Sequence, residues 1–373
     1  MIIEHFFKII NYTKKMITFV TLISTKNICH MYHTFIKIVL AIGTLMLVAS
    51  CSHDEPGSPF KPLEERRVLV LNYDGEIYDQ HGEMVMQLPN CTYAAEIISD
   101  GDDYFVSGVQ SKDRVGYWKN GKWNTLHVDF IDDVDHWTFG MGKWDYYIFL
   151  LDLPSVLKNS GIFPLEKCHD FIPADHGLSV SEGKCYVVGS GFGDGDTDED
   201  PYYKPILYTN YKKEYLPMPQ DVVTGECHAI YSYDRDHTII GGFIGLMPAV
   251  WVDKQYQIYE TSMPLSFDDH IPYGRIDAIT LCDGHIYGAG WERDESNHLV
   301  ATVWKDGIPV NYCSGETGVT SSQAIEIYTY DKDLYVLTSE YNSELDYDIT
   351  YLWLNGEIIM SYSGISATGF TVL

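Results

Sequence analysis

The stretch Asp283-Gly-His-Ile-Tyr-Gly-Ala-Gly290, followed by Trp304-Lys-Asp-Gly307, contains the pattern that decides the fold. An Asp-Gly turn precedes a short run with aromatic and β-branched residues, which is typical of a strand and too short for a helix. An aromatic residue then precedes a second Asp-Gly turn, and Asp-Gly and Asn-Gly favour the positive φ angles of two-residue hairpins. The stretch therefore predicts two consecutive hairpins, made of four short strands.

The same pattern recurs along the chain at intervals of about 40 to 50 residues. The first turn recurs at Asp100-Gly101, Gly142-Lys143, Glu182-Gly183, Asp234-Arg235 and Asp331-Lys332. The second turn is clearest in Trp118-Lys-Asn-Gly121 and Trp353-Leu-Asn-Gly356. Because the aromatic residue keeps its place in the unit, we interpret it as a packing anchor against the neighbouring unit.

Units of four short strands with this period resemble the blades of β-propellers. We predict an all-β propeller over residues 66–373 with seven four-stranded blades, six or eight being the alternatives. Three strands within 68–87 lack a fourth, which residues 369–373 supply in a blade shared between the termini. Such a blade closes the ring and removes exposed sheet edges. No kelch, Trp-Asp or Asp-box signature recurs, so the resemblance implies a fold and no family's binding site.

A basic and then apolar segment, Phe35-Ile-Lys37 followed by residues 38–50, leads directly to Cys51. The apolar run has 13 residues, whereas a helix that spans a bilayer needs roughly 20. With Val48-Ala49-Ser50-Cys51 at its end, the segment resembles the signal peptide and lipobox of bacterial lipoproteins. The resemblance implies cleavage before Cys51 and lipidation of this residue by acyl chains such as palmitate.

The predicted organisation has further parts before the propeller. Residues 1–30 do not fit a signal peptide, and we interpret them as translation from a spurious upstream start. Residues 31–50 are the signal peptide, and the polar residues 51–65 are a flexible tether. The acidic start of the tether resembles the export signal of lipoproteins on the outer face of the outer membrane, with a plain linker as the alternative. We expect an outer-membrane lipoprotein, exposed at the cell surface.

The balance of charge restricts the partners of the chain. It carries 25 Lys and Arg against 53 Asp and Glu, a formal charge of −28. A chain this acidic repels polyanions, so nucleic acid is not an expected partner. The expected partners are the membrane, through the lipid anchor, and a glycan or another surface protein. No Gly-x-Ser-x-Gly, His-Glu-x-x-His or Cys-x-x-Cys motif occurs, so no catalytic residue is assigned.

Acidic residues and histidines recur just before the predicted innermost strands. They are Asp135-His136, Asp175-His176, Glu226 with His228 and, a little earlier, Asp269-His270. In a propeller these links open at the mouth of the channel, where the residues form a ring able to bind a ligand or a metal. A structural role, with each histidine bonded to the adjacent blade, explains the same recurrence.

Two loops between predicted second and third strands mix aromatic rings with carboxylates and amides. They contain Trp291 and Tyr341. Rings stack on sugar faces while carboxylates and amides bind hydroxyls, so the loops favour a neutral glycan as the ligand. Ordinary surface loops with packed aromatic residues explain the composition equally well.

A third such loop carries alternating carboxylates. They are Asp194, Asp196, Asp198 and Asp200. These are hard oxygen ligands for Ca²⁺, and their spacing resembles the start of an EF-hand loop. The loop departs from that pattern at Glu199, in place of the turn glycine, and at Pro205, in place of the closing glutamate. A solvated acidic loop is the alternative to a Ca²⁺ site.

We predict an exported, lipid-anchored β-propeller that acts as a ligand-binding or protein-interaction module at the bacterial envelope, with a glycan as the leading ligand. Two alternatives remain open because a fold does not fix a function. One is a carbohydrate-active enzyme, a hydrolase or lyase with its site at the channel mouth. The other is a structural component of the envelope.

Overall fold

The computed structural model describes residues 65–110, 114–125, 137–142, 145–150, 155–158, 161–165, 171–192, 202–262 and 271–373. The chain divides into two units, Met1–Phe60 and Lys61–Leu373, and every described residue belongs to the second unit. The predicted signal peptide and Cys51 lie outside the described residues. Within the described ranges, no helix has the length and apolar character needed to cross a membrane.

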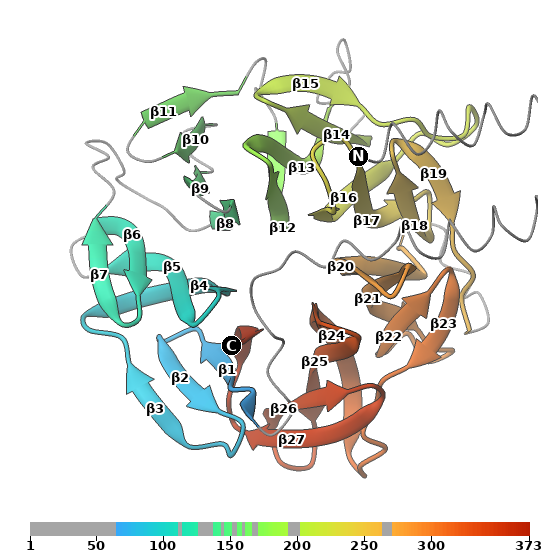
Figure 1. Ribbon diagram of the computed structural model, residues 1–373. Helices are drawn as coiled ribbons and strands as arrows, with labels where there is room; N and C mark the ends of the chain where they lie inside the picture. The colour runs from blue at the N-terminus through green and yellow to red at the C-terminus, as the bar shows by residue number, and fades with distance from the viewer. Residues whose placement is uncertain are drawn as a thin grey trace, which may run out of the picture. The chain divides into compact units, whose positions relative to one another are not determined.

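The described residues form an all-β structure, as predicted, built from antiparallel sheets of four strands (Figure 1). One sheet contains β4 (Cys91–Asp100), β5 (Asp103–Gln110), β6 (Arg114–Lys119) and β7 (Lys122–Thr125). The next contains β8 (Trp137–Gly142), β9 (Asp145–Leu150), β10 (Ser155–Lys158) and β11 (Gly161–Pro164). Two further sheets are β20 (Gly274–Cys282), β21 (His285–Arg293), β22 (Leu299–Lys305) and β23 (Ile308–Asn311), and β24 (Val319–Tyr330), β25 (Asp333–Asn342), β26 (Tyr347–Leu354) and β27 (Glu357–Ser363).

Two sheets depart from this simple order. An eight-stranded sheet joins two groups of four through one parallel contact, His176 with Ala229. Its first group is β12 (Phe171–Ser181), β13 (Lys184–Phe192), β14 (Tyr203–Thr209) and β15 (Lys212–Tyr215), and its second is β16 (Gly225–Ser232), β17 (Thr238–Ile244), β18 (Met247–Val252) and β19 (Gln255–Ile258). The other sheet combines both ends of the second unit, in the order β28 (Ala367–Val372), β1 (Val68–Asn72), β2 (Glu76–Asp79) and β3 (Met84–Gln87) (Figure 1).

The first strand of each group lies innermost and contacts the innermost strands of its neighbours. β4 contacts β28 and β8, and β12 contacts β8 and β16. β20 contacts β16 and β24, and β24 in turn contacts β28. In the six groups that are continuous in sequence, each strand pairs antiparallel with the strand that follows it in the chain, which is the organisation of propeller blades.

The second hairpin turns have the conformation that their sequence predicts. Asn120 and Gly121 have φ angles of 49° and 76°, and Asn355 and Gly356 have φ angles of 52° and 89°. Both residues of a type I′ turn need positive φ, which asparagine tolerates and glycine adopts without strain. The Asn-Gly pairs therefore fix the register of the outer two strands.

The tryptophan before these turns is a buried packing anchor, as predicted. Trp118, Trp251 and Trp304 have no exposed surface. Trp304 of β22 packs in one cluster with Ile239 and Val250 of the neighbouring group. The core thus lies between adjacent sheets as well as within them, so each sheet depends on the next for burial of its apolar face.

The described cysteines are free thiols. They are Cys91, Cys185, Cys227, Cys282 and Cys313. Burial raises the pKa of the Cys227 thiol well above its usual value, so this group stays protonated and unreactive.

Candidate functional site

The register of the strands defines one end of each sheet, which we call the mouth end. Gly225 at the start of β16 pairs with Ile244 at the end of β17. Gly274 at the start of β20 pairs with Glu292, one residue from the end of β21. The links that enter the innermost strands and the links between second and third strands therefore meet at this end.

A β-bulge interrupts the innermost strands near the mouth end. The register shifts between Cys227 and Ala229 in β16 and between Ile276 and Ala278 in β20. A bulge inserts one extra residue and re-aims its side chain. The extra residues are His228 and Asp277, which stand at equivalent positions of adjacent sheets.

A group of polar side chains surrounds Asp277, and we call it the mouth cluster. Its members are Glu226, His228, Arg275, Asp277 and Gln323. Asp277 Oδ1 lies 2.6 Å from Arg275 Nε and 3.9 Å from His228 Nδ1. Its Oδ2 accepts a hydrogen bond of 3.0 Å from Gln323 Nε2. The side chains come from β16, β20 and β24, so three consecutive sheets contribute to one cluster.

Glu226 and His228, both predicted from the sequence, are brought together in this cluster. Glu226 Oε2 lies 3.2 Å from His228 Nε2, and the two side chains are 27% and 20% exposed. The contact lacks hydrogen-bond geometry, because Nε2 has no hydrogen-bond partner in the structure. The imidazole also stacks on Phe243, with ring centres 6.0 Å apart. The ring is held in place, and its Nε2 atom is buried beside the Glu226 carboxylate without a hydrogen bond.

Trp291 lies beneath the mouth cluster and corrects one prediction. It belongs to β21, not to a loop, and is only 5% exposed. The guanidinium groups of Arg275 and Arg293 lie 5.3 and 5.2 Å from its ring. Arg293 donates hydrogen bonds to Pro272 O and to the backbone and side chain of Asn297. Trp291 therefore supports Arg275 and leaves little of its ring for a sugar to stack on.

Asp175 and His176 lie on β12, in the part of the strand where its register with β13 is irregular. His176 pairs in parallel with Ala229, the residue after His228, so the two histidines stand on adjacent innermost strands. Asp175 is one of the groups that raise the pKa of the Tyr93 hydroxyl.

Tyr341 belongs to strand β25, not to a loop as predicted, and stands at the mouth end of this strand but outside the cluster. Its ring is 39% exposed, and its hydroxyl donates a hydrogen bond of 2.8 Å to Asp346 Oδ1 in the following turn. This bond raises the pKa of Tyr341. The structure thus ties Tyr341 to its own turn.

The remaining predicted residues lie outside the described ranges. They are Cys51, Asp135, His136, Asp194, Asp196, Asp198, Asp200, Asp269 and His270. Among described residues, no group of three or more His, Cys, Asp or Glu side chains is placed to hold a metal ion. The Ca²⁺ site in the acidic loop stays a prediction.

Sequence reasoning missed Arg275, Asp277 and Gln323. The signal was present in the repeat, because Arg275 and Asp277 have the same two-residue spacing as Glu226 and His228. When the units are aligned on the bulge, and not on the acid-histidine pairs, Arg275 becomes equivalent to Glu226 and Asp277 to His228. The bulge itself leaves no local mark in the sequence, so its position becomes visible only in the strand register.

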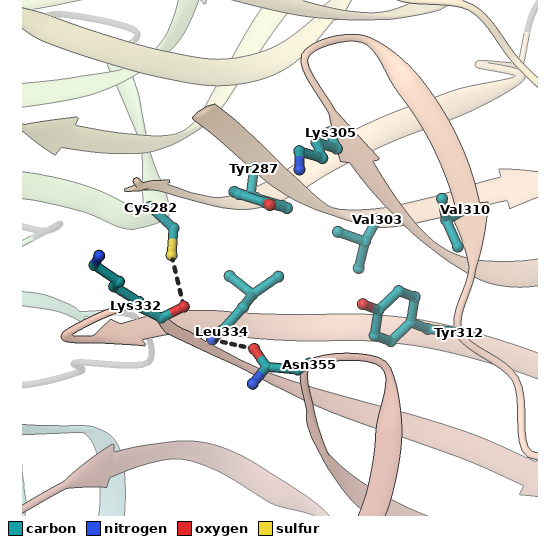
Figure 2. A pocket seen from close by; sticks show the side chains of 9 residues that line it. All are labelled: Cys282, Tyr287, Val303, Lys305, Val310, Tyr312, Lys332, Leu334 and Asn355. Carbon is teal, nitrogen blue, oxygen red and sulfur yellow. Dashed lines mark hydrogen bonds between the residues drawn. The ribbon is translucent and has the colours of Figure 1, made fainter. Parts of the chain in front are cut away.

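A cavity of about 280 Å³ lies between the sheets β20–β23 and β24–β27 (Figure 2). It is lined by Cys282, Tyr287, Val303, Lys305, Val310, Tyr312, Lys332, Leu334 and Asn355. Asn355 is committed to the turn, since its Oδ1 accepts a hydrogen bond from Leu334 N–H, and the Cys282 thiol donates to Lys332 O (Figure 2). The cavity combines apolar side chains with the amines of Lys305 and Lys332 and the hydroxyls of Tyr287 and Tyr312. The mouth cluster differs from it in drawing its polar side chains from three sheets at the end where the links meet, and we take it as the candidate site.

Comparison with known proteins adds little to this description. No known protein family matches the sequence, and no curated protein matches it. AofleA from Arthrobotrys oligospora is 11% identical over 86% of this chain and 94% of its own, with a TM-score of 0.42. An α-L-arabinanase of Cellvibrio cellulosa is 11% identical over 63% of this chain and 96% of its own, with a TM-score of 0.34. A neuraminidase-like protein of subtype N10 is 13% identical over 73% of this chain and 94% of its own, with a TM-score of 0.40. At these values the similarities assign neither a site nor an activity.

Proposed function

We propose that this protein is a lipid-anchored β-propeller that binds a glycan at the mouth cluster, on the surface of the bacterial envelope. The observation that carries the proposal is the convergence of Glu226, His228, Arg275, Asp277 and Gln323 from three adjacent sheets. A carboxylate, an imidazole, a guanidinium and an amide together offer both donors and acceptors to sugar hydroxyls.

The propeller of this proposal has seven blades and is closed by the sheet that β28 forms with β1. Support comes from the seven groups of four strands in the described residues and from their sheet order. Further support comes from the cyclic series of contacts among the innermost strands, which returns from β24 to β28. A closed ring places the innermost edge of each sheet beside those of its neighbours, which leaves only short, protected edges.

Membrane attachment rests on Cys51 and the segment before it. The basic and apolar residues that precede Val48-Ala49-Ser50-Cys51 support cleavage and acylation at this cysteine. Metabolic labelling with a palmitate analogue tests the anchor, since the full chain should be labelled and Cys51→Ser should not. Protease treatment of intact cells tests whether the propeller faces outward.

A glycan array with the full chain, purified in detergent, tests the binding function. We expect retention of a subset of glycans, and we expect Arg275→Ala to reduce it at least tenfold, because this substitution removes about 1.4 kcal/mol or more of charge-assisted hydrogen bonding. His237→Ala is the matched control, because His237 is an exposed histidine at the opposite end of β17. Retention of no glycan would contradict the proposal, and release of cleaved sugar would favour the carbohydrate-active enzyme instead.

A further inference from the structure

Two tyrosines form an aromatic pair beside the mouth end of the first two sheets. Tyr73 directly follows β1 and is 53% exposed. Its ring centre lies 4.5 Å from that of Tyr93 at an angle of 65°, an edge-to-face contact. A backbone hydrogen bond of 3.0 Å from Ala94 N–H to Tyr73 O joins the two sheets here. The pair is therefore fixed by backbone bonding, while much of the Tyr73 ring faces solvent.

The strand register places this pair at the same end of the sheets as the mouth cluster. Asn72, the last residue of β1, pairs with Ala367, the first residue of the innermost strand β28. Tyr93 stands two residues before the extra residue of the β4 bulge. Glu226 and Arg275 occupy this same position relative to the bulges of β16 and β20.

The charges of two carboxylates, Asp175 and Glu96, influence the hydroxyl group of Tyr93. Burial, followed by the influence of Tyr73, Asp175 and Glu96, raises the pKa of Tyr93 to about 12. The phenol therefore stays neutral and keeps its O–H donor at physiological pH. Because Asp175 belongs to β12, the aromatic pair and a carboxylate predicted to bind ligand lie within electrostatic reach of each other.

We propose that Tyr73 is a stacking subsite for one ring of an uncharged oligosaccharide whose other sugars bind the mouth cluster. The inference rests on the proposed glycan-binding function and names the class of glycan. An exposed aromatic ring takes the apolar face of a pyranose, whereas the polar cluster takes hydroxyl groups. The two regions belong to different sheets, β1 on one side and β16, β20 and β24 on the other, so one sugar does not occupy both.

The charges at the mouth end select against acidic glycans. Glu96, Asp175, Glu226 and Asp277 are carboxylates on the innermost strands. Of the two arginines at this end, Arg275 is paired with Asp277 and Arg293 donates hydrogen bonds to Pro272 O and to Asn297. A uronic or sialic acid brought to this end meets like charge, which costs binding energy. The carboxylates instead accept hydrogen bonds from neutral hydroxyls.

Titration calorimetry on the full chain tests the subsite. The probes are the neutral oligosaccharide that the array retains most strongly, its terminal monosaccharide, and a uronic-acid oligosaccharide of equal length. We expect Tyr73→Ala to weaken the neutral oligosaccharide by about tenfold, as for loss of one aromatic contact, and to leave the monosaccharide nearly unchanged. Tyr73→Phe should retain binding because the ring remains.

Tyr256→Ala is the matched control, since Tyr256 is 40% exposed on the outer strand β19, and it should bind like the unmodified chain. Unchanged affinity in Tyr73→Ala, or tighter binding of the uronic-acid probe, would overturn the inference while the proposed function stands. Failure of the unmodified chain to bind any glycan would overturn both. Melting curves of each variant separate lost binding from lost folding.

Discussion

In five groups of four strands, the asparagine or aspartate that opens the second hairpin turn has a positive φ angle and also forms two backbone-directed hydrogen bonds. Asn355 Oδ1 accepts from Leu334 N–H at 2.9 Å, and Asn355 N–H donates to Leu334 O at 2.8 Å. The same bonds recur at Asn120, Asn210, Asp253 and Asp306. This residue therefore fastens the start of the second strand to the end of the third, a role that its turn propensity alone does not indicate.

Replacing Asn355 with alanine should destabilise the protein by about 1–3 kcal/mol, because the hydrogen bond is lost and alanine is strained at positive φ. Replacing it with glycine should cost less, because glycine keeps the φ of 52° without strain and loses only the two side-chain bonds, with Leu334 N–H and with Asp333 Oδ1. Urea denaturation of the two variants measures the difference. Equal stability of the alanine variant and the unmodified chain would show that the bond is not stabilising.

The ionisation of one buried residue, Glu326, makes the stability of the folded protein depend on pH. It is 8% exposed on β24, and its Oε2 accepts a hydrogen bond of 2.6 Å from Phe370 N–H on β28. Burial and the negative charge of Glu96 raise the pKa of Glu326 well above its usual value, although the bond from Phe370 lowers it. Because the pKa of Glu326 is higher in the folded than in the unfolded chain, protonated Glu326 stabilises the folded protein. This stabilisation is complete below the pKa of the unfolded chain and is lost as pH rises through the pKa of the folded chain.

We therefore expect the melting temperature of Glu326→Gln to exceed that of the unmodified chain by a growing margin as pH rises from about 4 to 8. The reason is that glutamine accepts the hydrogen bond from Phe370 N–H without ionising. Near pH 4, below the usual pKa of glutamate, the two should melt at similar temperatures. Melting curves at several pH values measure this. A difference that does not change with pH would contradict the assignment.

At the scale of elements, the buried tryptophans connect one sheet to the next. Trp304 Nε1 on β22 donates to Glu260 O at 2.9 Å, and Trp251 Nε1 on β18 donates to Pro217 O at 2.8 Å. Both carbonyls lie in the link that leaves the preceding sheet. Trp118 Nε1 at the equivalent place has no hydrogen-bond partner in the structure. The three indoles are thus equally buried, but only those of Trp251 and Trp304 donate a hydrogen bond.

Trp304→Phe should cost more stability than Trp118→Phe, by about 1–2 kcal/mol, because only the first loses a hydrogen bond and leaves a carbonyl unsatisfied. Trp118→Phe is the control for the volume lost from the core. Denaturation midpoints of the two variants provide the comparison. A larger loss for Trp118→Phe would indicate that packing, and not this bond, joins the sheets.

At the scale of the whole molecule, the sequence predicts most of the fold and part of the site. The period, the Asn-Gly turns and the tryptophan anchors are local features, and the structure confirms each of them. The mouth cluster depends on bulges in separate strands, so Asp277 and Arg275 could not be recognised from local pattern alone. Trp291 was misplaced because strand β21 extends beyond the residues that look like a strand.

The pairing of β28 with β1 suggests a further prediction at this scale. Phe370 of β28 is fully buried and lies against Tyr335 of β25. Deleting residues 367–373 should lower the melting temperature by roughly 10 °C or more, because loss of one buried phenylalanine alone costs about 3–5 kcal/mol. Calorimetry of the deletion variant tests this. An unchanged transition would contradict a role for β28 in joining the two ends.

The most direct measurement is a crystal structure of the full chain with the neutral oligosaccharide that it retains most strongly. The account predicts sugar density in contact with Glu226, His228 and Arg275, and a second ring against Tyr73. Density confined to another surface, such as the cavity between β22 and β25, would contradict the claim that the mouth end is the binding site.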